Sequence, residues 1–127
     1  VVVKNERLEK VLISAMKQSV KAYLPKLNEI HDFKKFIAGT ADFKGQKFIA
    51  HCYSPANSKE TEKPLLKEIY KLQESVLILI GPEGDFSVEE VQLALKSDFQ
   101  EISLGPSRLR TETAALTACL TVHILNT

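Results

Sequence analysis

Three short apolar runs along the chain predict buried β-strands. The clearest is Val76–Ile80, which is unbroken and bounded by Ser75 and Gly81. Continuous rather than alternating hydrophobicity is typical of strands that are covered on both faces, as in parallel sheets. The other two strands are predicted over 48–53 and 101–104, where shorter apolar runs are bounded by polar or turn-forming residues.

Apolar residues at helical spacing predict helices between these strands. Ser87 and Glu90 have the spacing of a capping box, which places the start of a helix that runs to about Lys96. The last helix is apolar nearly all round, and a helix without a polar face is either deeply buried or part of a subunit interface. The remaining helices are predicted from Asn5 to the residue before Pro25, over 31–37, over 65–72 and, last, over 112–125.

Strands that alternate with helices indicate an α/β fold with a mostly parallel sheet flanked by helices. A chain of 127 residues is long enough for one domain with a real core, so we predict one domain over 1–127. The opening Val1-Val2-Val3, without an initiator Met, resembles the middle or end of a strand. We therefore expect the chain to be a fragment whose missing neighbour pairs with that segment.

The amino-acid composition limits which classes of partner, location and bound group we expect. The chain is 44% hydrophobic and 26% charged, with a net charge of +1. This near-neutral charge argues against binding to nucleic acid through overall charge, but it leaves a local basic patch possible. The sequence has neither a stretch of the roughly 20 apolar residues that span a membrane nor a signal peptide, so we expect no membrane and a cytoplasmic location. The loops are poor in His and Cys, and we expect no metal site. We interpret Cys52 and Cys119 as buried thiols, and His51 and His123 as core or interface histidines.

Two apolar runs stop at Gly-Pro corners, Gly81-Pro82 and Gly105-Pro106. Glycine lets a ligand approach the main chain, and proline stiffens the loop. Because ligands of open α/β sheets bind beyond the carboxyl ends of strands, the two corners predict two walls of one site. Neither corner matches a P-loop or a dinucleotide fingerprint, so we expect a ligand held mostly by backbone. The predicted apolar wall consists of Leu79, Ile80, Leu104 and Leu109.

The runs IGPEGDFSVEEV and LGPSRLRTETAA, together with the segment Ala15 to Lys21 followed by Pro25, resemble the small-subunit ribosomal RNA uridine-N3 methyltransferases, the RsmE family of the SPOUT class. The resemblance covers nearly the whole chain. It implies S-adenosylmethionine-dependent methylation of a uridine N3 in small-subunit (16S) ribosomal RNA, by a homodimer with a C-terminal trefoil knot. It also implies that the family's N-terminal RNA-binding barrel, and the start of the methyltransferase domain, are absent from this chain.

By the same resemblance the cofactor is expected to lie in the knotted loops. Methyl transfer to a uracil nitrogen requires the loss of its proton, and a positive group stabilises the resulting anion. Arg110 is the first candidate for this catalytic role, and Glu112 is a weaker candidate for the proton acceptor or for a dimer contact. The cofactor-binding residues implied are Leu79, Ile80, Gly81, Pro82, Glu83, Gly84, Leu104, Gly105, Leu109, Arg110, Thr111, Thr113 and Ala114.

Two positions depart from the family pattern. Asp85 stands where a second Gly is usual, so the loop either avoids positive φ there or places Asp in it. Lys21 stands where Arg is usual and would lose bidentate contact with RNA phosphate. These departures leave room for an alternative, a non-catalytic knotted module for RNA binding or dimerisation. A generic nucleotide-binding α/β domain is a further alternative, which the missing phosphate-loop Lys disfavours.

Overall fold

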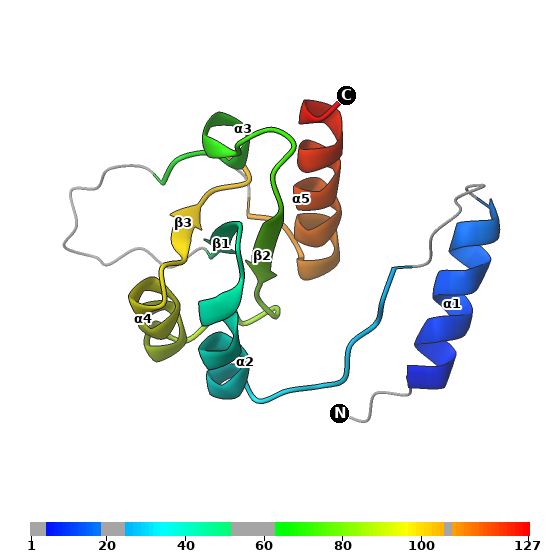
Figure 1. Ribbon diagram of the computed structural model, residues 1–127, viewed down its shortest axis with the longest axis horizontal. Helices are drawn as coiled ribbons and strands as arrows, with labels where there is room; N and C mark the ends of the chain where they lie inside the picture. Colours follow the sequence, from blue (N-terminus) through cyan, green and yellow to red (C-terminus); the bar gives the residue numbers. More distant parts are fainter. Residues whose placement is uncertain (1–4, 19–24, 52–62, 106–107) are drawn as a thin grey trace. The chain divides into compact units, whose positions relative to one another are not determined.

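The computed structural model describes residues 5–18, 25–51, 63–105 and 108–127, and the chain divides into two compact units, Val1–Asp32 and Phe33–Thr127. The first unit contains helix α1 (Asn5–Gln18), shown in Figure 1. Its start agrees with the predicted helix at Asn5, and the residues between Gln18 and Pro25, including Lys21, lie outside the described part. The second unit contains all the described strands and is an α/β structure, as predicted.

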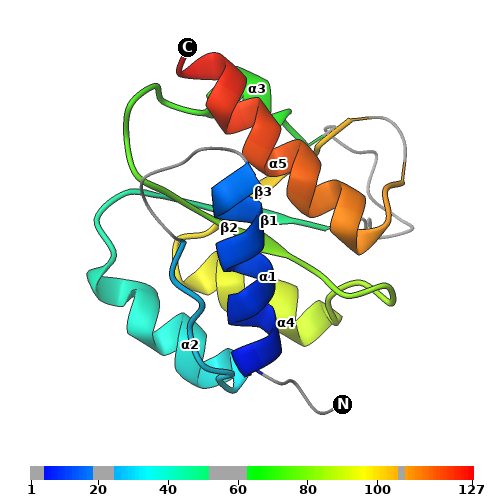
Figure 2. The ribbon, with the colours of Figure 1, turned by 90° about the vertical axis from the view of Figure 1, so that its right-hand side faces the viewer.

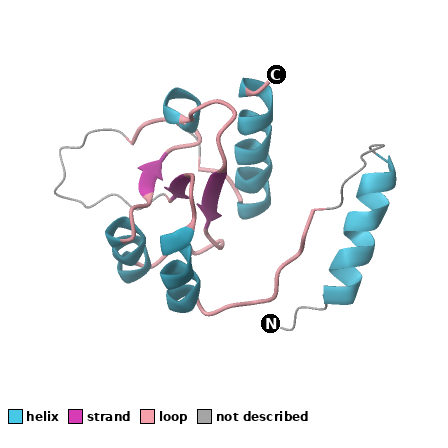
Figure 3. Ribbon diagram, viewed as in Figure 1, coloured by secondary structure: helices cyan, strands magenta, loops and turns pink. Residues whose placement is uncertain are grey.

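The sheet of the second unit has three parallel strands in the order β2-β1-β3, which are drawn as arrows in Figure 3. They are β1 (Gln46–Ala50), β2 (Val76–Ile80) and β3 (Gln100–Ile102). At the carboxyl end of the central strand, Ala50 pairs with Ile80 on one side and with Ile102 on the other. The predicted parallel sheet is therefore confirmed, with β2 at its expected bounds.

Helices cover both faces of this sheet, and Figure 2 shows α3 and α5 on one side of the strands and α2 and α4 on the other. The strongest sequence signal for a helix start is confirmed. Ser87 accepts from the Glu90 N–H at 3.1 Å, and the Glu90 carboxylate accepts from the Ser87 N–H at 2.8 Å. The bounds are α2 (Phe33–Gly39), a 3-10 turn η1 (Thr40–Asp42), α3 (Leu66–Ile69), α4 (Val88–Lys96) and α5 (Thr111–Leu125).

Successive residues of β1 point to opposite faces and anchor two separate cores. Ile49 is fully buried between the sheet and helices α2 and α4, where it packs with Ile37, Val91 and Ala94. Phe48 packs on the other face against α3 and α5. The two-sided burial explains why the strands read as continuous apolar runs in the sequence.

The surface of α5 corrects part of the sequence interpretation. Ala118 is the buried residue of this helix, whereas Cys119 and His123 are exposed. The interpretation of Cys119 as a buried thiol was wrong, because an apolar helix presents only one face to its own sheet. His123 does not lie in the core, and its alternative placement in an interface stays a prediction. Cys52 lies outside the described residues. The opposite face of α5 carries Leu116, Leu120 and Ile124, which are 63%, 55% and 65% exposed and are called the outer stripe below.

Candidate functional site

The carboxyl ends of β1 and β2 form a topological switch point. The next helix after β1, α3, packs on the Phe48 face of the sheet, whereas α4, which follows β2, packs on the Ile49 face. Chains that leave adjacent strands toward opposite faces open a crevice between them, where ligands of α/β proteins bind. At this switch point Ala50 pairs with Ile80, directly before Gly81.

The loop after β2 is a tight turn closed by backbone and side-chain packing. The Asp85 N–H donates to the Pro82 carbonyl at 2.8 Å, which closes a four-residue turn. A Cβ on Gly81 would stand 3.0 Å from the Phe86 ring, so a side chain does not fit without a shift of that ring. Phe86 is held in turn by packing against the α4 core and by a tilted contact with Phe33 at 5.9 Å between ring centroids.

Asp85 adopts φ of 67°, in the left-handed region. Of the two possibilities left open by the sequence, the loop therefore places Asp in a positive φ rather than avoiding one. Asp is among the few non-glycine residues that tolerate this conformation, although at a cost in free energy. Gly84, beside it, has no atom within 4 Å of the position of an added Cβ, so the outer side of the turn is open.

The corner after β3 is shaped by the Ser103 hydroxyl, which accepts from the Gly105 N–H at 3.2 Å and donates to the Gly105 carbonyl at 3.0 Å. Gly105 has φ of +145°, which L side chains rarely adopt, and the space where a Cβ would stand is open. A backbone that requires glycine and faces open space suits the close approach of a ligand to the main chain. Pro106 and Ser107 lie outside the described residues. We refer to 81–87 and 103–105 as the glycine loops.

The third segment of the site is the start of α5, which the fold holds against the first glycine loop. The Thr111 hydroxyl donates to the Gly81 carbonyl at 2.9 Å. Arg110 is the N-cap residue of α5, and its side chain is exposed, as is that of Glu112. Neither side chain has a hydrogen bond or ion pair to the rest of the chain among the described residues, so both are available to a ligand at the carboxyl edge of the sheet.

The predicted apolar wall divides between the two faces of the sheet. Leu79 packs into the Ile49 core, whereas Ile80 and Leu104 pack into the Phe48 core. Alternation along β2 imposes this division, so these side chains do not share one wall. That these positions bind the cofactor stays a prediction, and we expect such binding through their backbone atoms.

A polar cluster at the end of β1 was not expected from the sequence. The His51 side chain is 1% exposed, and its Nε2 lies 2.5 Å from Oε2 of Glu101. Lys63 donates to the His51 carbonyl and lies 3.4 Å from its Nδ1. His51 is therefore a buried residue with polar partners, directly beyond the strand pair that leads to Gly81. Its partners are 12 and 50 positions away, so no local pattern signals the cluster.

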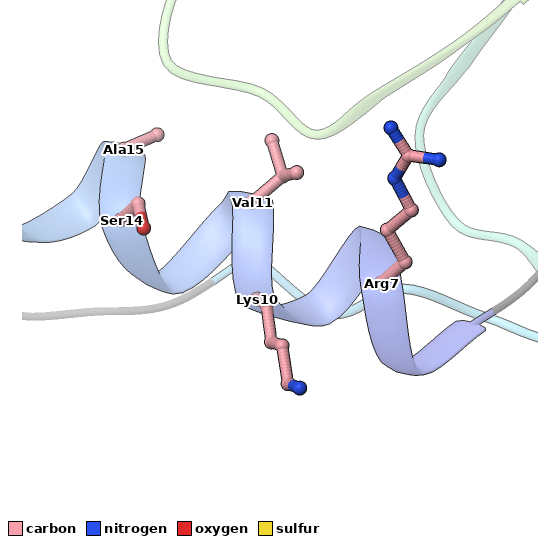
Figure 4. A pocket seen from close by; sticks show the side chains of 5 residues that line it. All are labelled: Arg7, Lys10, Val11, Ser14 and Ala15. Carbon is pink, nitrogen blue, oxygen red and sulfur yellow. The ribbon is translucent and has the colours of Figure 1, made fainter.

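A second surface feature, on helix α1, is a weaker candidate for a ligand site. Figure 4 shows a shallow concavity on α1, lined by Arg7, Lys10, Val11, Ser14 and Ala15; Arg7, Val11 and Ala15 point to one side and Lys10 to the other. One face of a single helix cannot enclose a ligand. Across the described ranges, no three His, Cys, Asp or Glu side chains gather as metal ligands would. Among the same residues, every helix is too short or too polar to cross a membrane.

Comparisons with known proteins show the family of this chain. Residues 2–123 match the family model of the RNA methyltransferase domain. The ribosomal RNA small subunit methyltransferase E of Mesomycoplasma hyopneumoniae is 32% identical, over 92% of this chain and 48% of its own length. The chain thus spans about half the length of the curated relatives that it matches.

Solved structures of methyltransferases are also similar to this chain. A probable rRNA-methyltransferase from Porphyromonas gingivalis has a TM-score of 0.85 and 42% identity, over 99% of this chain and 51% of its own. A putative methyltransferase from Legionella pneumophila, solved in complex with the bound cofactor SAM, has a TM-score of 0.75 and 30% identity, over 98% and 50% of the two chains.

Proposed function

This chain belongs to the RNA methyltransferase domain family, and from that premise we propose that it carries out S-adenosylmethionine-dependent methylation of a uridine N3 in small-subunit ribosomal RNA. The observation that carries the proposal is the hydrogen bond from Thr111 to the Gly81 carbonyl. It brings the start of α5, with Arg110, to the glycine loop at the switch point of the sheet. The relatives' names and the SAM-bound neighbour support the cofactor and the RNA class.

The residues present fit S-adenosylmethionine. The cofactor is a nucleoside with an amino-acid tail and no phosphate, so it needs main-chain hydrogen bonds rather than a phosphate-binding Lys. Gly105 and Gly84 offer main chain that faces open space, and Thr111 holds the two segments together. We assign the cofactor to the glycine loops and to residues 109–114. When bound, it would supply a methyl group on a sulfonium sulfur that departs as a neutral thioether, so the leaving group needs no metal to activate it.

The chain's own contribution is positioning and charge. Arg110 extends from the N-cap of α5 without a partner among the described residues, so its guanidinium can stabilise the uracil anion left when N3 loses its proton. Glu112, on the first turn of α5 and also exposed, is the group that could accept that proton. Holding the uracil nitrogen in line with the methyl group supplies much of the remaining acceleration of methyl transfer.

We further propose a cytoplasmic homodimer that buries the outer stripe, with α5 threaded as a trefoil knot. Leu116, Leu120 and Ile124 lie at intervals of four, on one face of the helix, and each is more than half exposed in the single chain. An apolar helix face of this kind marks a protein–protein contact when it is left uncovered. The knot and the two-fold partner are features that the family resemblance implies.

The direct test of the reaction uses small ribosomal subunits, or their RNA, that lack the modification. The encoded protein is incubated with S-adenosylmethionine that carries an isotope-labelled methyl group, and the RNA is digested and analysed by mass spectrometry. The proposal predicts label in 3-methyluridine. Label in another nucleoside would overturn the N3 assignment, and cofactor binding without any transfer would favour the non-catalytic module.

A further inference from the structure

At its carboxyl end the central strand separates from β3. Ala50 pairs with Ile102, but the residue that follows β3, Ser103, takes a new neighbour, Leu65, in a parallel bridge. The Ser103 N–H donates to the Pro64 carbonyl at 2.9 Å, and the Ser103 carbonyl accepts from the Leu66 N–H at 3.1 Å. The segment before α3 thus replaces β1 as the neighbour of β3, directly beside the glycine loops.

Three charged or polar side chains join the separating segments. Nε2 of His51, at the end of β1, lies 2.5 Å from the carboxylate of Glu101 on β3. With Nε2 as the donor to Glu101, the Nδ1 lone pair is left to accept from Lys63, whose ammonium also donates to the His51 carbonyl. The His51 side chain is 1% exposed, so its end of these bonds is shielded from water, whereas the Glu101 side chain is 38% exposed.

This chain of side chains adjoins both glycine loops. On one side, His51 follows Ala50, which pairs with Ile80, the residue before Gly81. On the other side, Lys63 precedes Pro64, whose carbonyl accepts the Ser103 N–H, and the Ser103 hydroxyl in turn accepts the Gly105 N–H at 3.2 Å. Two hydrogen bonds therefore connect Pro64, the residue after Lys63, with Gly105.

We propose that Glu101, His51 and Lys63 form a positioning chain, in which the buried His51 fixes the separation of β1 from β3 and so holds the glycine loops in their cofactor-binding geometry. The inference rests on the proposed function, because the bound molecule is S-adenosylmethionine. The three residues do not react. They act on cofactor affinity through Ser103 and Gly105, since positioning groups locked by a second layer of hydrogen bonds keep a site within its productive geometry.

The test compares variants in pairs, in the full encoded protein, by calorimetric titration of S-adenosylmethionine. Lys63→Met removes the ammonium but keeps the aliphatic stem. Its control is Lys47→Met, because Lys47 also donates to two carbonyl oxygens, of Ser97 at 2.6 Å and Thr40 at 3.4 Å, but at the opposite end of β1. Glu101→Leu removes the acceptor for His51, and Glu101→Gln keeps an acceptor oxygen at that place.

The proposal predicts that Lys63→Met and Glu101→Leu raise the dissociation constant about tenfold, the effect of losing a charge-assisted hydrogen bond. It predicts that Lys47→Met and Glu101→Gln stay within about twofold of the unmodified protein, as distant or conservative changes do. Thermal unfolding midpoints, measured for all four variants, distinguish a loss of cofactor affinity from a loss of stability. Because Glu101 is 38% exposed on its side chain, its two variants are expected to fold even where Lys63→Met does not.

The outcomes are distinguishable. Normal binding by the unmodified protein with no difference within the two pairs overturns this inference and leaves the proposed function intact. Absence of binding by the folded, unmodified protein overturns the proposed function, and this inference with it. A nitrogen NMR spectrum of the His51 ring is a readout that needs no cofactor: the proposal predicts a proton on Nε2 and not on Nδ1, and the reverse contradicts it.

Discussion

The Thr111 hydroxyl donates a hydrogen bond to the Gly81 carbonyl at 2.9 Å, and so joins two segments that are 30 positions apart in the chain. Gly81 directly follows the edge strand β2, and Thr111 begins α5. The bond satisfies a loop carbonyl that the sheet leaves without a strand partner, and it holds the N-terminus of α5 against the first glycine loop. The proposed cofactor site includes both segments.

Removal of that hydroxyl should weaken the site more than the fold. Thr111→Val keeps the shape of the side chain and leaves the Gly81 carbonyl without its donor, at a cost of about 1–3 kcal/mol. We expect the dissociation constant for S-adenosylmethionine, measured by calorimetry, to rise about tenfold. The matched control is Thr121→Val, because the Thr121 hydroxyl donates to the Thr117 carbonyl at 2.7 Å within the same helix. Equal losses of affinity in the two variants would contradict the assignment.

The left-handed conformation of Asp85 gives a second prediction. Asp85 and Asp98 have nearly the same φ, 67° and 68°, but Asp98 follows α4 and lies outside the proposed site. A β-branched residue at either position costs about 1–2 kcal/mol of strain, so Asp85→Val and Asp98→Val should lower the unfolding free energy by similar amounts. Chemical denaturation measures this loss.

Only the first of these two variants should also reduce cofactor affinity. The turn that Asp85 closes on Pro82 is part of the first glycine loop, whereas the turn at Asp98 is not. If cofactor titration shows that Asp98→Val is as damaging as Asp85→Val, the loop after β2 has no special role in binding.

Arg110 is expected to serve transfer rather than cofactor binding. Arg110→Ala should reduce the methylation rate by about 10²-fold, as the loss of an electrostatic stabiliser does, with cofactor affinity changed by much less. Arg108→Ala is the control, because Arg108 is an exposed arginine in the same segment. The measurement is single-turnover methylation beside calorimetry. Equal losses in rate and affinity for Arg110→Ala would mean that this residue only holds the cofactor.

The outer stripe of α5 predicts the oligomeric state. Leu120→Glu places a charge in the middle of the stripe, between Leu116 and Ile124, and should convert a dimer into monomers in sedimentation velocity experiments. Leu95→Glu is the comparison, since Leu95 is an exposed apolar residue of α4, 38% accessible. A dimer that survives Leu120→Glu, or a monomeric unmodified protein, would contradict the proposed interface.

Much of the fold could be predicted because local signals and tertiary packing agree. The unbroken run of β2 and the Ser87–Glu90 capping box gave correct bounds for a strand and a helix start. The helix predicted over 65–72 is shorter, because Tyr70 is extended and Gln73 adopts φ of 63°, and neither conformation is helical. A polar residue such as Gln73 does not by itself reveal in the sequence that its backbone turns away from the helix.

The site was predicted less completely than the fold. The two Gly-Pro corners indicated the glycine loops, but the predicted apolar wall overlooked the alternation of a strand, which sends Leu79 and Ile80 to opposite faces and into different cores. The sequence could not show that His51 meets Glu101 and Lys63, since the three come together only where β1 and β3 separate. The exposure of Cys119 depends on which face of an apolar helix packs on its own sheet, and periodicity does not decide that.

The central claim, that the glycine loops bind S-adenosylmethionine, is tested most directly by calorimetric titration of the cofactor into the unmodified protein, Gly105→Ala and Gly39→Ala. Gly105 has φ of +145° and requires glycine, whereas Gly39, at the end of α2, has φ of −70° and open space beside it. We predict saturable binding by the unmodified protein, a loss of about tenfold or more for Gly105→Ala through backbone strain, and unchanged affinity for Gly39→Ala. No binding by the folded protein, or equal affinity in the two variants, would contradict the claim.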